Sequence, residues 1–152
     1  MFRGPQVFTG YTDDAETTTA FHPGGWFRTG DIGRVDPRDG YLTITGRSKE
    51  VIITGGLNVY PREVELALET HADVSAAAVV GVASERWGEE VVAFVVAEPG
   101  RVPNGDGLIA FAHGRLAAYK CPKRVIAIGE LPVNAIGKLD RERLRELAGG
   151  VG

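Results

Sequence analysis

The chain has 152 residues, of which 17 are Lys or Arg and 20 are Asp or Glu, so its formal net charge is −3. This weakly acidic balance argues against a nucleic-acid-binding protein and against a polybasic membrane anchor, and no apolar run approaches the ~20 residues of a membrane span. The single cysteine, Cys121, rules out an intrachain disulfide, which favours a reducing compartment. Together these features predict a cytoplasmic protein that has no membrane span and binds no nucleic acid.

The first third of the chain, residues 1–47, is predicted to be β structure. Two strand-like runs, 29–35 and 41–45, flank a Pro-Arg-Asp-Gly sequence that is typical of a hairpin turn. In the second run Leu42 and Ile44 alternate with threonines, which predicts a half-buried strand.

A domain boundary is expected at Gly46-Arg47-Ser48-Lys49, where the β pattern breaks. A short apolar strand over 51–53 and a loop over 54–58 follow. Pro61 then suits the first turn of a helix, and most glutamates of this helix are expected on its solvent-exposed face. The apolar face of this helix is predicted from residues that repeat at helical spacing, Val64, Ala67, Leu68 and His71.

The remainder is predicted to be a sheet covered by helices. Apolar runs over 76–82 and 91–96 indicate buried strands, joined by a polar loop over 84–90. A Gly- and Pro-rich linker over 99–107, an amphipathic helix over 108–116, a strand over 125–128 and a final helix follow, with Asp140 as its cap and Leu144 and Leu147 facing inward. The fold class is therefore α+β, with short sheets flanked by helices after a β-rich stretch.

Two sequence motifs near the boundary could contact a nucleotide. Asp31, at the end of Trp26-Phe27-Arg28-Thr29-Gly30-Asp31, could accept hydrogen bonds from a ribose diol. Arg47 and Lys49 could contact an anionic nucleotide and serve a hinge. Taken alone, each motif is explained more simply as an ordinary polar turn.

Three further motifs could bind phosphate or stabilise charge. Gly55-Gly56 could admit a close ligand, although it matches neither a P-loop nor a G-x-G-x-x-G sequence, and a tight strand-to-helix turn is as good an explanation. The cations of the segment 119–124 lie beside Tyr119 and could bind a phosphorylated base, with Trp87 as a second stacking surface; a solvated loop and a packing tryptophan are the alternatives. Lys138 lies in a Pro- and Gly-bounded loop and could stabilise a charged transition state, or simply be exposed.

No metal site or nucleophilic arrangement is expected. His22, His71 and His113 have no ligand spacing, and no Ser/His/Asp or Cys/His set is present.

The order and spacing of these motifs are more specific than each motif alone. The runs 26–31, 46–65 and 131–138 together resemble the C-terminal part of the adenylate-forming superfamily, which contains acyl-CoA synthetases, peptide-synthetase adenylation domains and firefly-type luciferases. The resemblance extends from Gly4 to Leu147. It implies a two-step reaction with ATP, Mg²⁺ and CoA, in which a carboxylic acid becomes an acyl-adenylate and a thiol then displaces AMP.

The resemblance also implies a domain organisation. Residues 1–46 would be the β-rich end of a large N-terminal AMP-binding domain, and 47–152 a mobile C-terminal lid domain. The seam after Gly46 is where the hinge between them is expected. Because the ATP-cradling loop and the acid pocket would lie in the large domain, we expect the chain alone to be inactive.

The resemblance assigns roles to residues that match the family's motifs. Asp31 would grip the ribose hydroxyls, Arg47 would contact the nucleotide, Lys49 would be the hinge residue, and Lys138 would bridge the carboxylate and the α-phosphate. CoA would be bound by a set in which the glycine turn lines the pantetheine tunnel: Gly55, Gly56, Leu57, Trp87, Tyr119 and Lys123. Cys121 stands where many relatives carry Arg, which leaves Lys120, Lys123 and Arg124 to supply positive charge.

The branch of the superfamily is indicated by Lys49 and by the segment 58–63. Both resemble acyl-CoA synthetases of the fatty-acyl and malonyl type rather than peptide synthetases, which favours a fatty acid as the substrate. The alternatives are an adenylation domain or lid module that loads a carrier protein, and a non-catalytic fragment that binds a partner.

Overall fold

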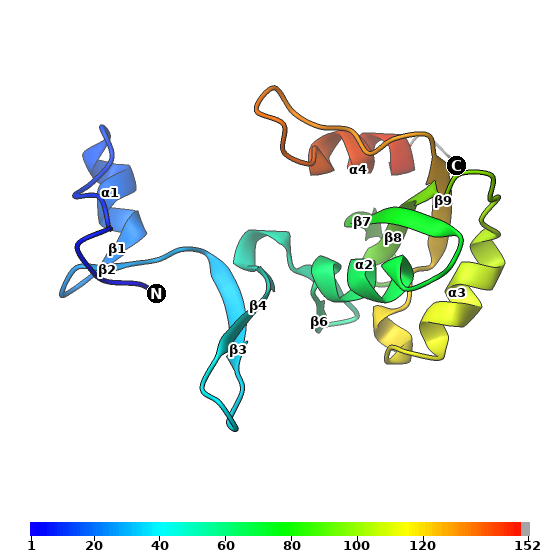
Figure 1. Ribbon diagram of the computed structural model, residues 1–152. Coiled ribbons are helices and arrows are strands. Elements are labelled where there is room, and N and C mark those ends of the chain that lie inside the picture. Colours follow the sequence, from blue (N-terminus) through cyan, green and yellow to red (C-terminus); the bar gives the residue numbers. More distant parts are fainter. Residues whose placement is uncertain (150–152) are drawn as a thin grey trace. The chain divides into compact units, whose positions relative to one another are not determined.

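The computed structural model describes residues 1–149 and forms two compact units (Figure 1). The first is Met1–Lys49, and the second begins at Glu50. A short 3-10 helix, η1 (Ser48–Glu50), runs through the boundary.

The first unit opens with a helix that the sequence analysis did not predict. Helix α1 (Asp14–Ala20) precedes a two-stranded antiparallel pair, β1 (Phe21–His22) and β2 (Trp26–Phe27). The expectation of β structure throughout 1–47 was therefore wrong here, because three consecutive threonines favour strands when propensity alone is considered. Asp13 overrides that preference: its Oδ1 accepts hydrogen bonds from the N–H groups of Ala15 and Glu16, at 2.7 and 3.3 Å.

The predicted hairpin is confirmed as β3 (Asp31–Val35) paired antiparallel with β4 (Leu42–Arg47). The expected half-buried face is wrong, because Leu42 and Ile44 are 61% and 51% exposed. Their alternation with threonine is present, but no other described element of the first unit covers that face.

The second unit contains a five-stranded sheet in which β8 is central. Strand β7 pairs antiparallel with β8, β9 lies parallel to β8, and β5 pairs with β6 and with the start of β8. The strands are β5 (Ile52–Thr54), β6 (Leu57–Val59), β7 (Val74–Ser84), β8 (Gly88–Ala97) and β9 (Arg124–Ile128). The loop expected over 54–58 is wrong at both ends, because only Gly55 and Gly56 form a turn, and the residues on either side belong to β5 and β6. The polar loop over 84–90 is likewise only a short turn, because both strands continue into it.

Helices cover both faces of this sheet, as predicted. Helices α2 (Pro61–Glu69) and α3 (Gly105–His113) pack on one face and α4 (Arg141–Gly149) packs on the other, while η2 (Ala118–Lys120) precedes β9 (Figure 1). Helix α3 begins before the expected 108 because the Asn104 side chain caps it. The fold is therefore a mixed α/β small domain of short sheets and helices, in agreement with the predicted class.

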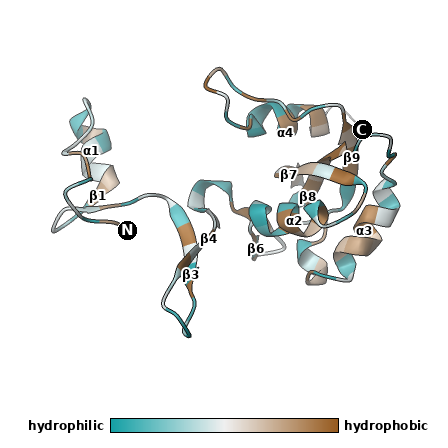
Figure 2. Ribbon diagram, viewed as in Figure 1, coloured by the Kyte–Doolittle hydropathy of each residue, from teal (hydrophilic) through white to brown (hydrophobic). Residues whose placement is uncertain are grey.

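Each face of the sheet has its own apolar core. On one side Val79, Val91 and Val95 pack with Leu68 and Leu108; on the other, Phe94 and Val92 pack with Leu144 and Ala148. Figure 2 shows the strands of this unit as largely hydrophobic.

The predicted inward face of α4 is right for Leu144 and wrong for Leu147. Leu147 is 36% exposed, whereas Ala148 is 1% exposed. Ala148 lies four residues after Leu144 and so occupies the same stripe of the helix, which leaves Leu147 at its edge.

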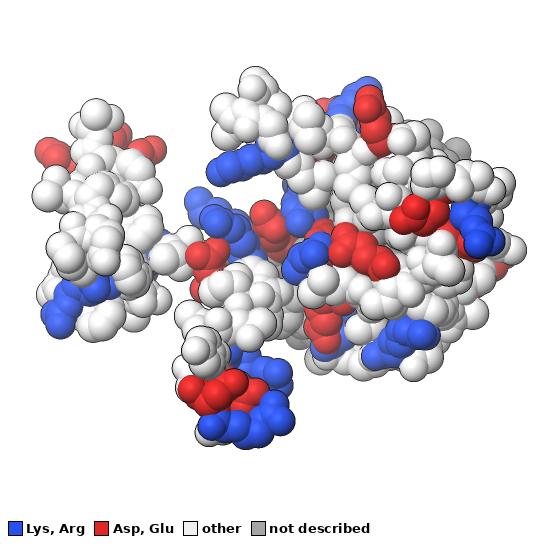
Figure 3. All heavy atoms as spheres, in the orientation of Figure 1, with Lys and Arg blue, Asp and Glu red and all other residues white. Residues whose placement is uncertain are grey.

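On the visible face of the second unit several acidic and basic side chains lie next to one another (Figure 3). Ion pairs of this unit include Lys120–Glu63 and Arg124–Glu90. None of the helices within residues 1–149 has the length and apolar character needed to cross a membrane.

Candidate functional site

The structure brings two of the predicted nucleotide-binding residues together. Asp31 begins β3 and Arg47 ends β4, and the two are cross-strand partners. The Arg47 guanidinium Nε lies 3.2 Å from Asp31 Oδ1. Their side chains are 61% and 24% exposed, respectively, so this pair is open to solvent and available to a ligand. One carboxylate oxygen of Asp31 is engaged by Arg47, and the other can still accept a hydrogen bond.

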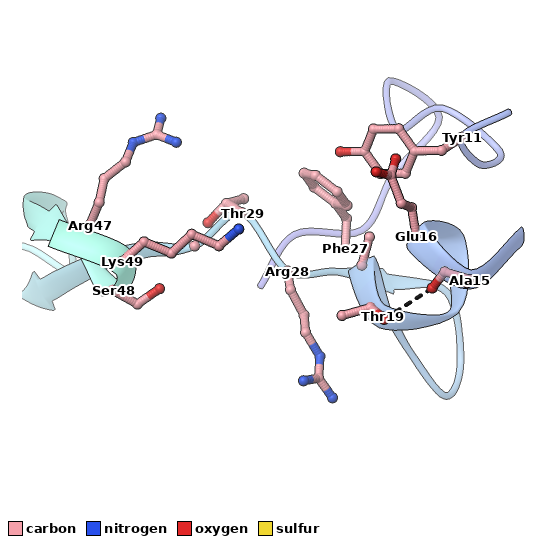
Figure 4. Close-up of a pocket in the computed structure, with 12 residues that line it drawn as sticks. Tyr11, Ala15, Glu16, Thr19, Phe27, Arg28, Thr29, Arg47, Ser48 and Lys49 are labelled. Carbon is pink, nitrogen blue, oxygen red and sulfur yellow. Dashed lines mark hydrogen bonds between the residues drawn. The ribbon is translucent and has the colours of Figure 1, made fainter. Parts of the chain in front are cut away.

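Arg47 and Lys49 also line a pocket of the first unit, an open hollow of about 750 Å³. Figure 4 shows these two cations and Ser48 at one end of the pocket, and Tyr11 and Glu16 of the α1 region at the other. The pocket therefore presents positive charge at the side next to the unit boundary.

The glycine turn of the second unit is held against Trp87. Gly55 and Gly56 have φ angles of +56° and +78°, which side chains with a Cβ rarely adopt. The Gly55 N–H donates to the Trp87 carbonyl at 2.8 Å, and a Cβ at Gly55 would lie 3.3 Å from Trp87 Cε3. The positive φ therefore favours glycine at position 55, and a Cβ there would crowd the adjacent indole.

Cations surround the exposed indole. Trp87 is 40% exposed, the Lys123 ammonium lies 5.9 Å from its ring centroid, and the Arg86 guanidinium lies 4.8 Å away. This geometry is within the range of cation–π attraction. We call this surface, made of Gly55, Arg86, Trp87 and Lys123, the indole patch. It combines positive charge with a flat aromatic face, which suits a phosphorylated aromatic base.

Leu57 and Tyr119 lie outside the indole patch, on two elements that contact each other. Leu57, which is 49% exposed, is on β6, and β6 lies beside η2, which carries Tyr119. Tyr119 is 37% exposed. Within residues 1–149 the ring of Tyr119 has a cation–π contact with Lys120, at 5.8 Å, whereas the ring of Trp87 has its contacts with Arg86 and Lys123.

The cations expected to replace the family's arginine at 121 are mostly engaged. Lys120 Nζ donates to both carboxylate oxygens of Glu63 at 2.6 and 2.8 Å, and the hydrogen bond raises the pKa of Lys120. Arg124 pairs with Glu90 at 3.1 Å. Lys123, by contrast, has no ion pair among the described residues. Cys121 is fully buried, and burial raises the pKa of its thiol, so it behaves as a core residue.

Lys138 lies in the exposed loop that connects β9 to α4. Within the described chain its ammonium forms no ion pair, so its charge is free for a ligand. In Figure 1 the loop that leads into α4 and strand β6 lie at different ends of the second unit.

Sequence reasoning missed a buried cluster of charges. Glu65 is 3% exposed, and its Oε1 accepts hydrogen bonds from Arg141 Nη1 at 3.0 Å and from the Val79 N–H at 3.1 Å. Arg141 Nε also pairs with Glu50 at 3.1 Å. The available signal was the position of Glu65 in the apolar stripe of α2, between Val64 and Leu68. Among residues 1–149, no group of three His, Cys, Asp or Glu side chains could hold a metal ion.

Comparison with known proteins identifies the family. Residues 63–138 match the family described as "AMP-binding enzyme C-terminal domain". The chain is 45% identical to an indoleacetate–CoA ligase of Aromatoleum aromaticum over 97% of its own length and 29% of that protein, and 46% identical to a long-chain-fatty-acid–CoA ligase of Bacillus subtilis over 96% and 26%. The crystal structure of ATP-bound MatB from Rhodopseudomonas palustris is similar with a TM-score of 0.86 and 41% identity, covering 95% of this chain and 29% of that one.

The chain therefore spans less than a third of the length of these relatives. The relatives are CoA ligases, and the matched region is the C-terminal domain of adenylate-forming enzymes. The chain belongs to the family of AMP-binding enzyme C-terminal domains.

Proposed function

We propose that this chain is the C-terminal part of an acyl-CoA ligase that activates a carboxylic acid with ATP and transfers the acyl group to the thiol of CoA. The observation that carries the proposal is the presence of two distinct features on one small domain, a loop with a lysine that has no ion pair among the described residues and the cationic indole patch. The Lys138 loop suits chemistry at a phosphate, and the indole patch suits a phosphorylated base.

In the first half-reaction, a carboxylate oxygen attacks the α-phosphorus of ATP and the bond to pyrophosphate breaks. Negative charge accumulates on the carboxylate and α-phosphate oxygens. Lys138 is proposed to stabilise that charge, because its ammonium has no ion pair among the described residues. An ammonium stabilises a developing negative charge most strongly where water is excluded. Asp31 and Arg47 are proposed to hold the ribose and the nucleotide, a role supported by their exposed pair at the end of the β3–β4 hairpin.

In the second half-reaction, the CoA thiolate attacks the acyl carbonyl and AMP leaves. We assign the pantetheine arm to the glycine turn at Gly55 and Gly56 with Leu57. The indole patch would hold the CoA nucleotide by stacking on Trp87 and by the charge of Lys123. Tyr119 remains a proposed contact on the neighbouring η2.

The two half-reactions require different surfaces, which supports a rotating lid. We propose that residues 1–46 are the β-rich end of a large AMP-binding domain, that 47–152 are the lid and that Lys49 is the hinge. The boundary of the compact units, after Lys49, supports this division. In the absence of the large domain, we expect the chain alone to release no pyrophosphate from ATP.

Mg²⁺ is proposed to enter with the ATP phosphates rather than in a cage of this chain. The described residues offer no cluster of three ligating side chains, and Mg²⁺ is commonly held by substrate phosphates with one or two carboxylates. The cytoplasm remains the proposed compartment, because the single cysteine is buried and free.

A fatty acid is the proposed substrate, on the basis of the Lys49 and 58–63 motifs. Relatives of nearly equal identity are named for an arylacetic acid and for a long-chain fatty acid. The complete protein that contains this chain should therefore be assayed with fatty acids of several lengths and with arylacetic acids. Turnover confined to the aromatic acids would contradict the fatty-acid proposal.

The ligase proposal is tested by transplantation. The matching segment of the Bacillus subtilis long-chain-fatty-acid–CoA ligase is replaced by this chain, and the ligase lacking that segment is the control. We expect the chimera to catalyse acid-dependent ATP–pyrophosphate exchange and to form acyl-CoA. A folded chimera that is no more active than the control would refute the proposal. Acyl transfer to a carrier protein's phosphopantetheine, but not to CoA, would favour the carrier-loading alternative.

A further inference from the structure

The loop that carries Lys138 is closed by backbone hydrogen bonds at its base. Val133 and Leu139 form an isolated antiparallel bridge, and the Asp140 N–H donates to the Pro132 carbonyl at 2.8 Å. The segment is therefore a small hairpin that ends where α4 begins. Its tip contains Asn134 through Lys138.

Asn134 binds the backbone of Lys138 on both sides. The Lys138 N–H donates to Asn134 Oδ1 at 3.0 Å, and the Asn134 N–H donates to the Lys138 carbonyl at 2.7 Å. The same Oδ1 accepts from the Ile136 N–H at 3.2 Å, and the Gly137 N–H donates to the Asn134 carbonyl at 2.9 Å. Gly137, with φ +75°, completes a tight turn with Asn at its first position and Gly at its last.

These hydrogen bonds are the main source of order in the tip. Val133 and Ile136 are 63% and 75% exposed, so apolar burial does not hold them. An exposed segment with few packed side chains opens easily, and its population of a single conformation depends on its hydrogen bonds. The Asn134 side chain supplies an acceptor for the N–H of Lys138 that the turn geometry does not otherwise provide.

We infer that Asn134 is a positioning residue for Lys138: it fixes the Lys138 backbone so that the ammonium is presented in one place during adenylation. The inference rests on the proposed function. A reacting group that is misplaced by about 1 Å can lose on the order of 10²-fold in rate, so an ordered tip has a direct kinetic value. The thiol-transfer step, which uses the glycine turn and the indole patch, does not depend on this order.

The chain offers a matched control at Asn104. Its Oδ1 accepts hydrogen bonds from the N–H groups of Asp106 and Gly107 at 3.0 and 3.3 Å, where it caps α3. Asn104→Ala therefore removes the same chemical interaction from a different part of the same unit. Any general effect of losing an Asn cap appears in both variants.

The first arm of the test measures backbone amide exchange in the 152-residue chain. Asn134→Ala should accelerate exchange of the Lys138 amide by about fivefold, the effect of one hydrogen bond, and Asn134→Ser, which keeps a weaker acceptor, should be intermediate. Asn104→Ala should leave the Lys138 amide unchanged. Unaltered Lys138 exchange in Asn134→Ala would overturn the inference.

The second arm measures both half-reactions in the chimera described above. We expect Asn134→Ala to lower ATP–pyrophosphate exchange at least tenfold while thioester formation from supplied acyl-adenylate changes less than twofold. Asn134→Ser should recover part of the exchange, and Asn104→Ala should leave the ratio of the two rates unchanged. Equal loss of both half-reactions, or loss of neither, would overturn the inference. An unmutated chimera without exchange would instead overturn the proposed function, while the amide measurement still reports on the loop.

Discussion

Replacing Arg141 by Met should destabilise the second unit strongly, because it leaves Glu65 without its main counter-charge. Arg141 Nη1 lies 3.0 Å from Glu65 Oε1 and donates to the Val79 carbonyl at 2.8 Å, and its Nε lies 3.1 Å from Glu50. The side chains of Arg141 and Glu65 are 17% and 4% exposed. Little water can therefore reach the carboxylate when the guanidinium is removed.

The expected loss of unfolding free energy lies near the lower end of the range for breaking a buried ion pair. Removing one partner of a buried ion pair costs about 3–5 kcal/mol. The Val79 N–H and Arg62, which lies 3.5 Å from Glu65 Oε2, remain and soften the loss, so we expect about 3 kcal/mol. For a domain of about 100 residues this corresponds to a fall of at least about 12 °C in Tm.

Thermal and urea unfolding measure this effect, with Arg143→Met as the matched control. Arg143 pairs with Glu146 on the same helix, but the two side chains are 57% and 65% exposed, so its loss should cost at most about 0.5 kcal/mol. The double variant Glu65→Met/Arg141→Met should be more stable than Arg141→Met alone, because no unpaired charge remains inside. If Arg141→Met costs no more than Arg143→Met, or if the double variant is the less stable, the reasoning is wrong.

Three smaller predictions follow from the same unit. Gly55→Ala should lower the free energy of unfolding by about 1–3 kcal/mol, and by more than Gly56→Ala does. Both glycines have a positive φ, but only a Cβ at position 55 would contact the indole of Trp87. Equal losses of stability for the two variants in urea unfolding would contradict this. Cys121 should react with a thiol reagent at pH 8 only at the rate of unfolding, and rapid labelling of folded protein would contradict its burial. Lys120 has a raised pKa in the folded state, so its pair with Glu63 contributes fully below the unfolded pKa of about 10.4 and is lost as the pH rises through the folded pKa. Lys120→Met should therefore be less stable than the unmutated chain by up to about 1 kcal/mol near neutral pH, and this difference should narrow above pH 10. A difference in unfolding free energy that stays constant with pH would contradict the assignment.

Much of the second unit was predictable because its signals are local. Two continuous apolar runs identify β7 and β8, and they also predict that helices cover both faces of the sheet. Pro61 marks the start of α2, and Asp140 marks the start of α4: its Oδ1 accepts a hydrogen bond from the Arg143 N–H at 3.0 Å.

Two of the errors come from local signals that were misinterpreted, and one comes from a tertiary contact. Helix α1 forms in a threonine-rich segment because Asp13 caps it. Leu57 pairs with Thr54 in a strand because Gly55 and Gly56 permit a two-residue hairpin turn, which looks the same in sequence as a strand-to-helix turn. Glu65 can be buried because it forms an ion pair with Arg141, which is distant in sequence. No spacing rule within α2 identifies that partner.

The candidate site was predictable in its residue types and only partly in its geometry. The pairing of Asp31 with Arg47 follows from the register of a hairpin whose strands were predicted. The closeness of Trp87 to Gly55 depends on the pairing of β5 with β8, which no local pattern encodes. The engagement of Lys120 by Glu63 could not be foreseen for the same reason, and it leaves Lys123 to face the indole together with Arg86.

The most direct test of the central claim is a comparison of the two half-reactions after Lys138→Ala in the chimera with the Bacillus subtilis ligase. We expect ATP–pyrophosphate exchange to fall by about 10²–10³-fold, the usual effect of removing one group that stabilises transition-state charge. Thioester formation from supplied acyl-adenylate should remain close to that of the unmutated chimera. An equal fall in both half-reactions, or an unchanged rate of exchange, would contradict the role assigned to Lys138 and with it the proposed division of labour between the two surfaces.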